Sequence, residues 1–293
     1  MDYVIETQAL TKRFGKQVAV NQVSFHVRRG DIYGLIGKNG AGKTTLMRLL
    51  LGLAFPNSGE IRIFGGDKQA AQKIGALIEA PGLYLSENAF ENMKRFAILT
   101  GSSDEEIRNL LALVGLADTG KKTVGKFSLG MKQRLGIAIA LLGSPELLIL
   151  DEPVNGLDPA GIKEIRDLIL ELHARGVTFL ISSHLLDELG KIATTYGIMA
   201  NGFLVEEITA TELAERCKTS LEVHTDNGPQ AAELLRQWRP ELELSVTENT
   251  VHIASEIADT SDVTLVLAGA GVRVYEIRNA SVGQEDFFIE RMG

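Results

Sequence analysis

Three short apolar runs mark the first two-thirds of the chain. They lie within residues 31–36, 146–150 and 177–182. Strands that are buried on both faces, as in a parallel sheet, have continuous apolar sequences rather than alternating ones. Helical patterns at 160–174 and 185–194 separate or follow these runs. The pattern therefore predicts an α/β core.

Other patterns predict two subdomains around this core. The N-terminal stretches "YVIETQALTKRF" and "QVAVNQVSFHVRRGD" alternate apolar and polar residues, as antiparallel strands with one exposed face do. Residues 85–145 have a mainly helical pattern, and "DEEIRNLLALVGL" is typical of a capped amphipathic helix. We expect an N-terminal antiparallel β subdomain and a helical subdomain at about 85–145.

A domain boundary is predicted near residues 211–219, which divides the chain into 1–215 and a small accessory domain at 220–293. The accessory domain has the order βαββαβ of a ferredoxin-like fold, with "TENT" as a hairpin turn. Trp238 and His252 are interpreted as packing residues. The expected elements are strand 220–225, helix 228–238, strands 242–247 and 250–254, helix 257–268, strand 272–277 and a short closing helix in "SVGQEDFFIERM".

Length and charge agree with this division and restrict the partners. A chain of 293 residues is long enough for about two domains. The net charge of −8 arises in the accessory domain, where residues 220–293 hold 13 acidic and 5 basic side chains. An acidic domain repels nucleic acid and anionic lipid, which are themselves negatively charged, so we expect no nucleic-acid partner.

Cysteine content and targeting signals predict a cytoplasmic location. The single cysteine, Cys217, allows no internal disulfide, which agrees with a reducing compartment. The N-terminus "MDYVIETQAL" lacks the features of a signal peptide. No apolar run approaches the roughly 20 residues that cross a bilayer. The sequence predicts a protein that is soluble or held at a membrane through a partner.

Residues 37–44, "GKNGAGKT", match the phosphate-loop pattern in full and lie between a predicted strand and a helix. Glycines let backbone N–H groups face phosphate oxygens. Lys43 supplies charge to the β and γ phosphates, and Thr44 offers its hydroxyl to Mg²⁺. The predicted ATP-binding residues of this segment are Gly37, Lys38, Asn39, Gly40, Ala41, Gly42, Lys43, Thr44 and Thr45.

Acidic residues and a histidine follow the other two apolar strands. Asp151, in "LLILDEP", is placed to orient Mg²⁺. Glu152 is either another acid at a strand end or the group that polarises the attacking water. His184 follows the strand at 177–182 and is either structural or a contact of the γ-phosphate. Its position at the end of a core strand favours the functional interpretation.

A second candidate phosphate site lies in "KFSLGMKQRLGIAIALL", residues 126–142. Ser128 is a natural N-cap, Gly130 allows close approach of an anion, and Lys132 and Arg134 add positive charge. A helix N-terminus of this kind binds phosphate. The residues alone do not explain why one chain has two phosphate sites.

Together these motifs resemble one family, the ATP-binding subunits of ABC transporters, over residues 1–215. The phosphate loop alone marks only a nucleotide-binding fold. The specific features are "SLGMKQR", "LILDEP", "NGLDP" and "SSHLLDE". The signature "SLGMKQ" differs from its commonest form, which has a glycine in place of Leu129 and a glutamine or similar residue near Met131. Ser128 and Gly130 are kept, so we expect phosphate binding there.

The resemblance implies a function for the second phosphate site. In the family, two subunits pack head to tail, and the signature helix of one encloses the ATP of the other. We therefore expect a homodimer, or a dimer with a related ATPase subunit. Phe14 matches the position on which adenine stacks. The residues expected at the partner's ATP are Ser128, Leu129, Gly130, Met131, Lys132 and Gln133. Those expected in the loop that crosses between subunits are Asn155, Gly156, Leu157 and Asp158.

Glu79 occupies the position of a glutamine that, in most relatives, reaches Mg²⁺ and the attacking water. A glutamate there, the context "EAPGLY" and the small C-terminal domain resemble the exporters that confer resistance to bacitracin and lantibiotics. We expect Glu79 to contact ATP and, with Thr44 and Asp151, the metal. The alternative is a neutral substitution in a variable loop.

The resemblance thus implies an ATPase that uses ATP and Mg²⁺ to power a separate integral membrane permease from the inner face of the cell membrane. Three alternatives are weighed against it. A soluble ABC ATPase acting on ribosomes or DNA usually has two ATPase units or a long insertion, and this chain has neither. A non-catalytic regulator is expected to lose Lys43, Glu152 or His184, and all are present. A transporter for an unrelated cargo stays open.

Overall fold

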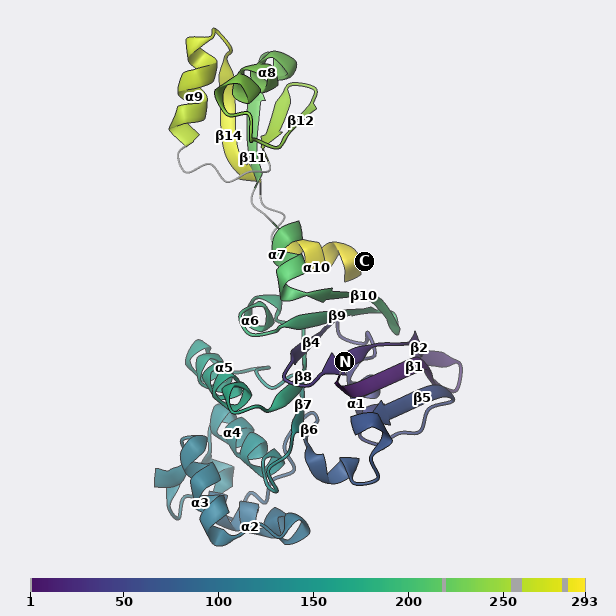
Figure 1. Ribbon diagram of the computed structural model, residues 1–293. Coiled ribbons are helices and arrows are strands. Elements are labelled where there is room, and N and C mark those ends of the chain that lie inside the picture. Colours follow the sequence, from purple (N-terminus) through teal and green to yellow (C-terminus); the bar gives the residue numbers. More distant parts are fainter. Residues whose placement is uncertain (1, 218–219, 254–259, 281–283, 293) are drawn as a thin grey trace. The chain divides into compact units, whose positions relative to one another are not determined.

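The computed structural model describes residues 2–217, 220–253, 260–280 and 284–292. The chain divides into two compact units (Figure 1). The first unit contains Met1–Ala210 together with Phe288–Gly293, and the second contains Thr211–Phe287.

A six-stranded sheet forms the centre of the first unit, with the strand order β10-β9-β4-β8-β7-β6. All neighbours are parallel except β10, which is antiparallel to β9. Every residue of β4, β7 and β8 is buried, which confirms the prediction from the continuous apolar runs. The strands are β4 (Ile32–Ile36), β6 (Ile74–Leu77), β7 (Leu147–Asp151), β8 (Thr178–Ser183), β9 (Thr195–Ala200) and β10 (Phe203–Thr209).

A second, antiparallel sheet confirms the expected N-terminal β subdomain. Its long strand β1 (Tyr3–Phe14) pairs with three others. They are β2 (Gln17–Val23), β3 (His26–Arg28) and β5 (Ser58–Ile63). Phe25 and Val27 belong to the same buried cluster as Leu35 of β4 and Leu46 of α1 (Lys43–Leu50). The antiparallel sheet and the central sheet therefore share one core, which holds α1 between them.

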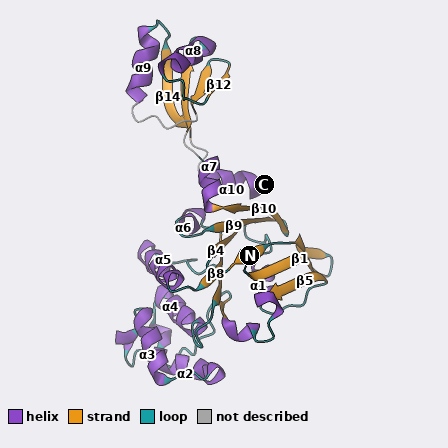
Figure 2. Ribbon diagram, viewed as in Figure 1, coloured by secondary structure: helices purple, strands orange, loops and turns teal. Residues whose placement is uncertain are grey.

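Helices gather at the β6 end of the central sheet, in the region where a helical subdomain is expected (Figure 2). The helix α4 (Leu129–Ala140) contacts α2 (Ala89–Thr100), α3 (Asp104–Leu113), β6 and α5 (Pro159–Ala174). Asn88 and Ser103 cap α2 and α3 by accepting hydrogen bonds from backbone N–H groups. Short 3₁₀ helices lie at Phe64–Gly66, Ala70–Lys73, Ala117–Thr119 and Val124–Lys126.

The predicted helix at 185–194 is shorter in the structure, where α6 covers only Leu186–Gly190. It ends because the chain joins the sheet, where the backbone N–H of Thr194 already donates to the carbonyl of Ile32. No helix in the described part of the chain is long and apolar enough to cross a membrane.

The second unit contains a four-stranded antiparallel sheet with the order β12-β13-β11-β14. Its strands are β11 (Ser220–Thr225), β12 (Leu244–Thr247), β13 (Thr250–Ile253) and β14 (Val274–Ala280). The helices α8 (Gly228–Trp238) and α9 (Thr260–Gly269) share a buried core with the sheet. Most predicted elements are thus present. The helix 257–268 was predicted to begin within residues 254–259, which lie outside the described residues.

The end of the chain belongs to the first unit, which the sequence did not predict. The helices α7 (Ala210–Arg216) and α10 (Gln284–Met292) lie at the two ends of the second unit along the chain. On α10, the buried ring of Phe288 lies 5.4 Å from that of Tyr196 on β9, between ring centres. Arg291 Nε forms an ion pair of 2.5 Å with Glu206 Oε2 on β10.

We expect Phe288→Ala to lower the free energy of unfolding of the first unit by about 3–5 kcal/mol, because it removes a buried aromatic ring. Thermal unfolding followed by circular dichroism measures the effect. The adjacent Ile289 is largely exposed, so Ile289→Ala is the matched control, with an expected change of about 0.5 kcal/mol or less. Equal unfolding temperatures for the two variants would contradict a stabilising role of α10.

Candidate active site

The phosphate loop has the backbone geometry that its glycines predict. Gly40 and Gly42 have φ angles of +83° and +108°, which favour glycine. A Cβ atom on Gly42 would lie 2.3 Å from the carbonyl oxygen of Ala19, so no other residue fits there. The loop residues Gly37, Lys38, Asn39, Gly40, Ala41 and Gly42 connect β4 to α1, which begins with Lys43, Thr44 and Thr45. The N-terminus of α1 therefore faces the loop, as an anion site requires.

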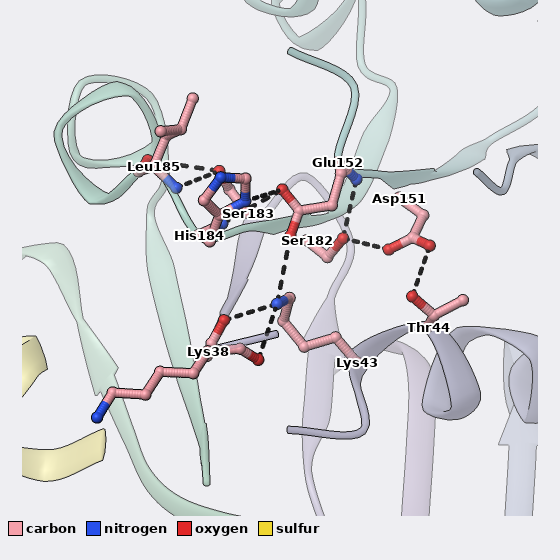
Figure 3. A network of polar contacts seen from close by, with 10 residues as sticks. Lys38, Lys43, Thr44, Asp151, Glu152, Ser182, Ser183, His184 and Leu185 are labelled. Carbon is pink, nitrogen blue, oxygen red and sulfur yellow. Dashed lines mark hydrogen bonds and ion pairs between the residues drawn. The ribbon is translucent and has the colours of Figure 1, made fainter. Parts of the chain in front are cut away.

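Lys43 is buried and bent back over this loop (Figure 3). Its ammonium group donates to the carbonyl oxygen of Gly37 at 2.6 Å. The same Nζ lies 3.2 Å from Glu152 Oε1. The Glu152 carboxylate thus forms an ion pair with the lysine that is predicted to meet phosphate.

Thr44 and Asp151 face each other across the site. Thr44 Oγ1 donates to Asp151 Oδ2 at 2.8 Å, and Asp151 is buried at the end of β7. A hydroxyl and a carboxylate oxygen are ligands that Mg²⁺ prefers, together with phosphate oxygens and water. The pair therefore fits the metal. The described residues contain no cluster of three His, Cys, Asp or Glu side chains that could hold a metal ion.

Glu152 is held between Lys43 and His184. Its Oε2 accepts hydrogen bonds from His184 Nδ1 at 2.7 Å and from the His184 backbone N–H at 3.3 Å. A carboxylate only accepts, so Nδ1 carries the proton in this pair. Five predicted residues thus lie together at one site: Glu152 contacts Lys43 and His184, and Thr44 contacts Asp151, the neighbour of Glu152 in the chain (Figure 3). Their chemical roles stay predictions.

Ser182 belongs to this site, but the sequence analysis gave it no role, although it is the first residue of the motif "SSHLLDE". Its hydroxyl donates to Asp151 Oδ1 at 2.5 Å and accepts from the backbone N–H of Glu152 at 2.9 Å. Ser182 lies directly opposite Asp151 in the parallel pairing of β7 and β8. Neighbouring parallel strands bring their carboxyl ends to the same edge of a sheet. A polar residue at the end of the second buried strand was therefore the signal in the sequence that could have placed Ser182 near Asp151.

The signature helix begins as predicted. Ser128 Oγ accepts from the backbone N–H of Met131 at 3.2 Å and caps α4. A Cβ atom on Gly130 would have its nearest neighbour 3.8 Å away, so the backbone is open at this position. Gln133 is buried within the chain. Arg134 Nη1 donates to the carbonyl oxygen of Val114 at 2.8 Å, which assigns this side chain to packing against α3 rather than to phosphate.

The loop at Asn155–Asp158 lies against the signature segment of the same chain. A Cβ atom on Gly156 would lie 3.2 Å from Leu129 Cδ2. Leu129 is itself 50% exposed. Asp158 caps α5 by accepting from the backbone N–H of Gly161 at 3.2 Å, a structural role that the sequence analysis did not assign. The contacts of these residues with a partner subunit stay predictions.

Phe14 and Glu79 lie outside the connected site. Phe14 ends β1 and is 54% exposed, and Lys12 Nζ lies 5.0 Å from the centre of its ring. Its stacking on adenine stays a prediction. Glu79 is 62% exposed and forms an ion pair of 2.7 Å with Arg48 Nη2 on α1. Its φ of +59° is unusual for a residue with a side chain. The structure thus pairs Glu79 with a cation, and its contact with the metal stays a prediction.

Comparison with known proteins identifies the family. The family model "ABC transporter" matches residues 20–155. The chain is 41% identical to the bacitracin transport ATP-binding protein BcrA of Enterococcus faecalis, over 100% of this chain and 97% of the relative. The chain belongs to the ATP-binding proteins of ABC transporters. It is an ABC transporter ATPase, and its fold is the α/β cassette with an antiparallel β subdomain.

Two further relatives show which part of this ABC ATPase the similarity covers. It is 46% identical to the lantibiotic transport ATP-binding protein SrtF of Streptococcus pyogenes, over 70% of this chain and 90% of the relative. Among solved structures it is similar to cbiO1 of Clostridium perfringens, part of the ABC transporter complex cbiONQ. The TM-score is 0.65 and the identity 27%, over 73% of this chain and 91% of that chain. The similarity to BcrA therefore covers more of this chain than the similarity to either SrtF or cbiO1 does.

Proposed function

We propose that this ABC ATPase binds ATP together with Mg²⁺ at the site around Lys43 and hydrolyses it by in-line attack of water. Thr44 and Asp151 would hold the metal, which neutralises phosphate charge when bound. The observation that carries the proposal is the connected arrangement of Lys43, Thr44, Asp151, Glu152 and His184.

The ion pair between Lys43 and Glu152 gives the order of events in this proposal. Lys43 Nζ lies 3.2 Å from Glu152 Oε1, and in this proposal the phosphate oxygens of ATP attract the ammonium group away from that carboxylate. The Glu152 carboxylate is then free on one oxygen to polarise water, while its other oxygen stays with His184. Binding therefore prepares the general base, and the barrier falls mainly through positioning and charge neutralisation.

We infer a head-to-tail dimer, either with a second copy or with a related ATPase subunit. The cap on Ser128 and the open backbone at Gly130 provide a second anion site at the start of α4. The Ser128 hydroxyl accepts a hydrogen bond from the backbone N–H of Met131 in the first turn of α4. A partner's ATP accounts for this second site.

We also infer that the chain serves a separate membrane permease on the cytoplasmic face and that the transporter exports or protects against peptides of the bacitracin or lantibiotic type. The relatives that carry these names match it at 41% and 46% identity. They are transport proteins, which favours transport over a role at ribosomes or DNA. The ion pair of Glu79 with Arg48 is compatible with a position that links the site to a permease.

Growth of a sensitive bacterium tests the cargo. We expect co-expression of the chain with its neighbouring permease gene to raise the inhibitory concentration of bacitracin or a lantibiotic several-fold. The same pair carrying Glu152→Gln is the control and is expected to give no protection. Protection against an unrelated compound, with none against either peptide class, would contradict this cargo but not the ATPase.

Glu79→Gln tests the role of Glu79. We expect ATP binding to be kept and peptide protection or turnover to change, because the substitution removes the charge that pairs with Arg48. Nucleotide titration and growth assays measure the two effects. Glu60→Gln is a matched control, since the Glu60 side chain is as exposed as that of Glu79 and forms an ion pair with Arg62. Unchanged turnover and protection would support the alternative of a neutral substitution.

We further propose that the chain holds an ATPase domain, predicted at 1–215, and a ferredoxin-like accessory domain within the predicted range 220–293, without the last residues from Phe288 onward, which belong to the first unit. The support is the order β12-β13-β11-β14 with antiparallel pairing throughout and two helices in the same core. The contacts of Phe288 with Tyr196 and of Arg291 with Glu206 support ending the accessory domain before Phe288.

A further inference from the structure

We propose that Ser182 is a positioning residue of the ATPase site, which fixes the Asp151 carboxylate and the Glu152 backbone relative to one another. The inference rests on the proposed roles of these two acids. It adds a residue that neither the phosphate-loop motif nor the acidic motif contains.

The position of Ser182 follows from the central sheet. β7 and β8 are parallel, and Asp151 and Ser182 are direct partners in their pairing. Ser182 is fully buried, so its hydroxyl has no access to bulk water. Buried polar groups need partners inside the protein. The two acids supply them, one through a carboxylate oxygen and the other through its N–H group (Figure 3).

The directions of these hydrogen bonds are fixed by chemistry. A serine hydroxyl has one proton to donate and lone pairs that accept. Asp151 Oδ1 only accepts, so the proton points to Asp151 at 2.5 Å. The backbone N–H of Glu152 only donates, and it reaches Ser182 Oγ at 2.9 Å. The hydroxyl therefore cannot exchange its two partners, and it connects the acids in one orientation.

For Asp151, this contact determines how the carboxylate is turned. Oδ1 is held by Ser182, and Oδ2 is held by Thr44 at 2.8 Å. Both oxygens of a buried carboxylate thus have a defined partner, and the oxygen that faces Thr44 is the one aimed at the predicted metal site. Without the serine hydroxyl, Oδ1 loses its partner, and rotation of the carboxylate costs little.

For Glu152, the contact holds an uncommon backbone conformation. Its φ is +49°, in the left-handed region that residues with a Cβ atom rarely adopt. The N–H group lies within hydrogen-bond distance of both the hydroxyl and the carbonyl oxygen of Ser182, the latter at 3.2 Å. Strain of this kind persists where surrounding groups determine the conformation. Ser182 is such a group, and by holding the Glu152 backbone it fixes the position from which the Glu152 side chain extends.

The chain offers a matched control in the next residue. Ser183 is also buried at the end of β8. Its hydroxyl accepts from the backbone N–H of Leu185 at 2.9 Å and lies 3.4 Å from the Leu185 carbonyl oxygen. Ser183 therefore organises the turn into α6, whereas Ser182 contacts the two acids. Replacing each with alanine removes the same atom from adjacent buried positions.

The experiment compares Ser182→Ala, Ser182→Val and Ser182→Thr with Ser183→Ala in the full-length chain. Threonine and valine have nearly the same shape, and only threonine keeps a hydroxyl. Binding of the fluorescent analogue TNP-ATP is titrated in EDTA and at increasing Mg²⁺, with Glu152→Gln also present so that no turnover occurs. ATPase rates and unfolding temperatures are measured without Glu152→Gln.

We expect Ser182→Ala and Ser182→Val to raise the Mg²⁺ concentration needed for half-maximal binding and to lower the ATPase rate, each by about 10–100-fold, as loss of a group that orients a metal ligand does. Binding in EDTA should stay within about twofold, since the phosphate loop is unchanged. Ser182→Thr is expected to restore most of both effects, and Ser183→Ala to leave both close to wild type.

The inference would be overturned if Ser182→Val, Ser182→Thr and wild type needed the same Mg²⁺ concentration for half-maximal binding. It would also be overturned if Ser182→Val and Ser182→Thr lost ATPase rate alike and both had a lower unfolding temperature, because the loss would then come from instability. Such results leave the proposed ATPase intact, because wild type still shows Mg²⁺-dependent binding and hydrolysis. If wild type shows neither, the proposed function fails, and the role of Ser182 fails with it.

Discussion

Glu152→Gln is expected to lower the rate of ATP hydrolysis by about 10²–10⁴-fold and to trap an ATP-bound dimer. Glutamine has nearly the same shape as glutamate but does not take a proton from water. The substitution also removes the negative charge that lies 3.2 Å from Lys43 Nζ. Lys43 is then free to meet phosphate, so we expect tighter binding of ATP together with slower turnover. Steady-state phosphate release and gel filtration with Mg²⁺ and ATP measure the two effects.

Glu171→Gln provides the comparison, because Glu171 forms an exposed ion pair with Arg175 on α5, outside the connected site. Its rate and its elution volume are expected to match those of wild type. Hydrolysis at the wild-type rate in Glu152→Gln would falsify the assignment of the general base. Slow hydrolysis without tighter binding would support the base but contradict the release of Lys43 by ATP.

The sequence was sufficient to predict five of the residues that meet at the edge of the central sheet, but not Ser182. Strands buried on both faces give continuous apolar runs, and the groups that follow such strands are brought to one edge by parallel pairing. Thr44, Asp151 and His184 come together for this reason, although 107 residues separate the first two. The cap on Ser128 was also predictable, because capping is local and depends on a few neighbouring residues.

The contacts that the sequence did not reveal are side-chain contacts between distant segments. Ser182 is one of many serines in the sequence, and only the register of β7 and β8 places it against Asp151. Arg134 lies in the first turns of the signature helix, where a contact with phosphate was predicted. Its long side chain instead reaches the carbonyl oxygen of Val114 at the end of α3. Phe288 meets Tyr196 after the chain has passed through a whole second unit. Patterns of three to four residues carry no information about such contacts.

The predicted phosphate site at the start of α4 leads to the prediction about dimer assembly with the largest expected effect. In a head-to-tail dimer, the phosphate loop of one subunit and the signature of its partner form one ATP site, and two such sites exist. Lys43→Ala damages the first half of a site. Gly130→Asp damages the second half by placing a negative charge where phosphate is expected. A Cβ atom at Gly130 meets no neighbour closer than 3.8 Å, so the chain itself tolerates a side chain there.

Mixed dimers with two different affinity tags separate the possible arrangements. When Lys43→Ala is on one subunit and Gly130→Asp on the other, both defects fall in the same ATP site, and the other site is intact. When both substitutions are on one subunit and the partner is wild type, each site has one defect. We expect the first mixed dimer to retain one ATP after gel filtration with Mg²⁺, and the second to retain none. The opposite result is expected if each chain used its own signature helix, because the first dimer would then have no intact site and the second would keep one.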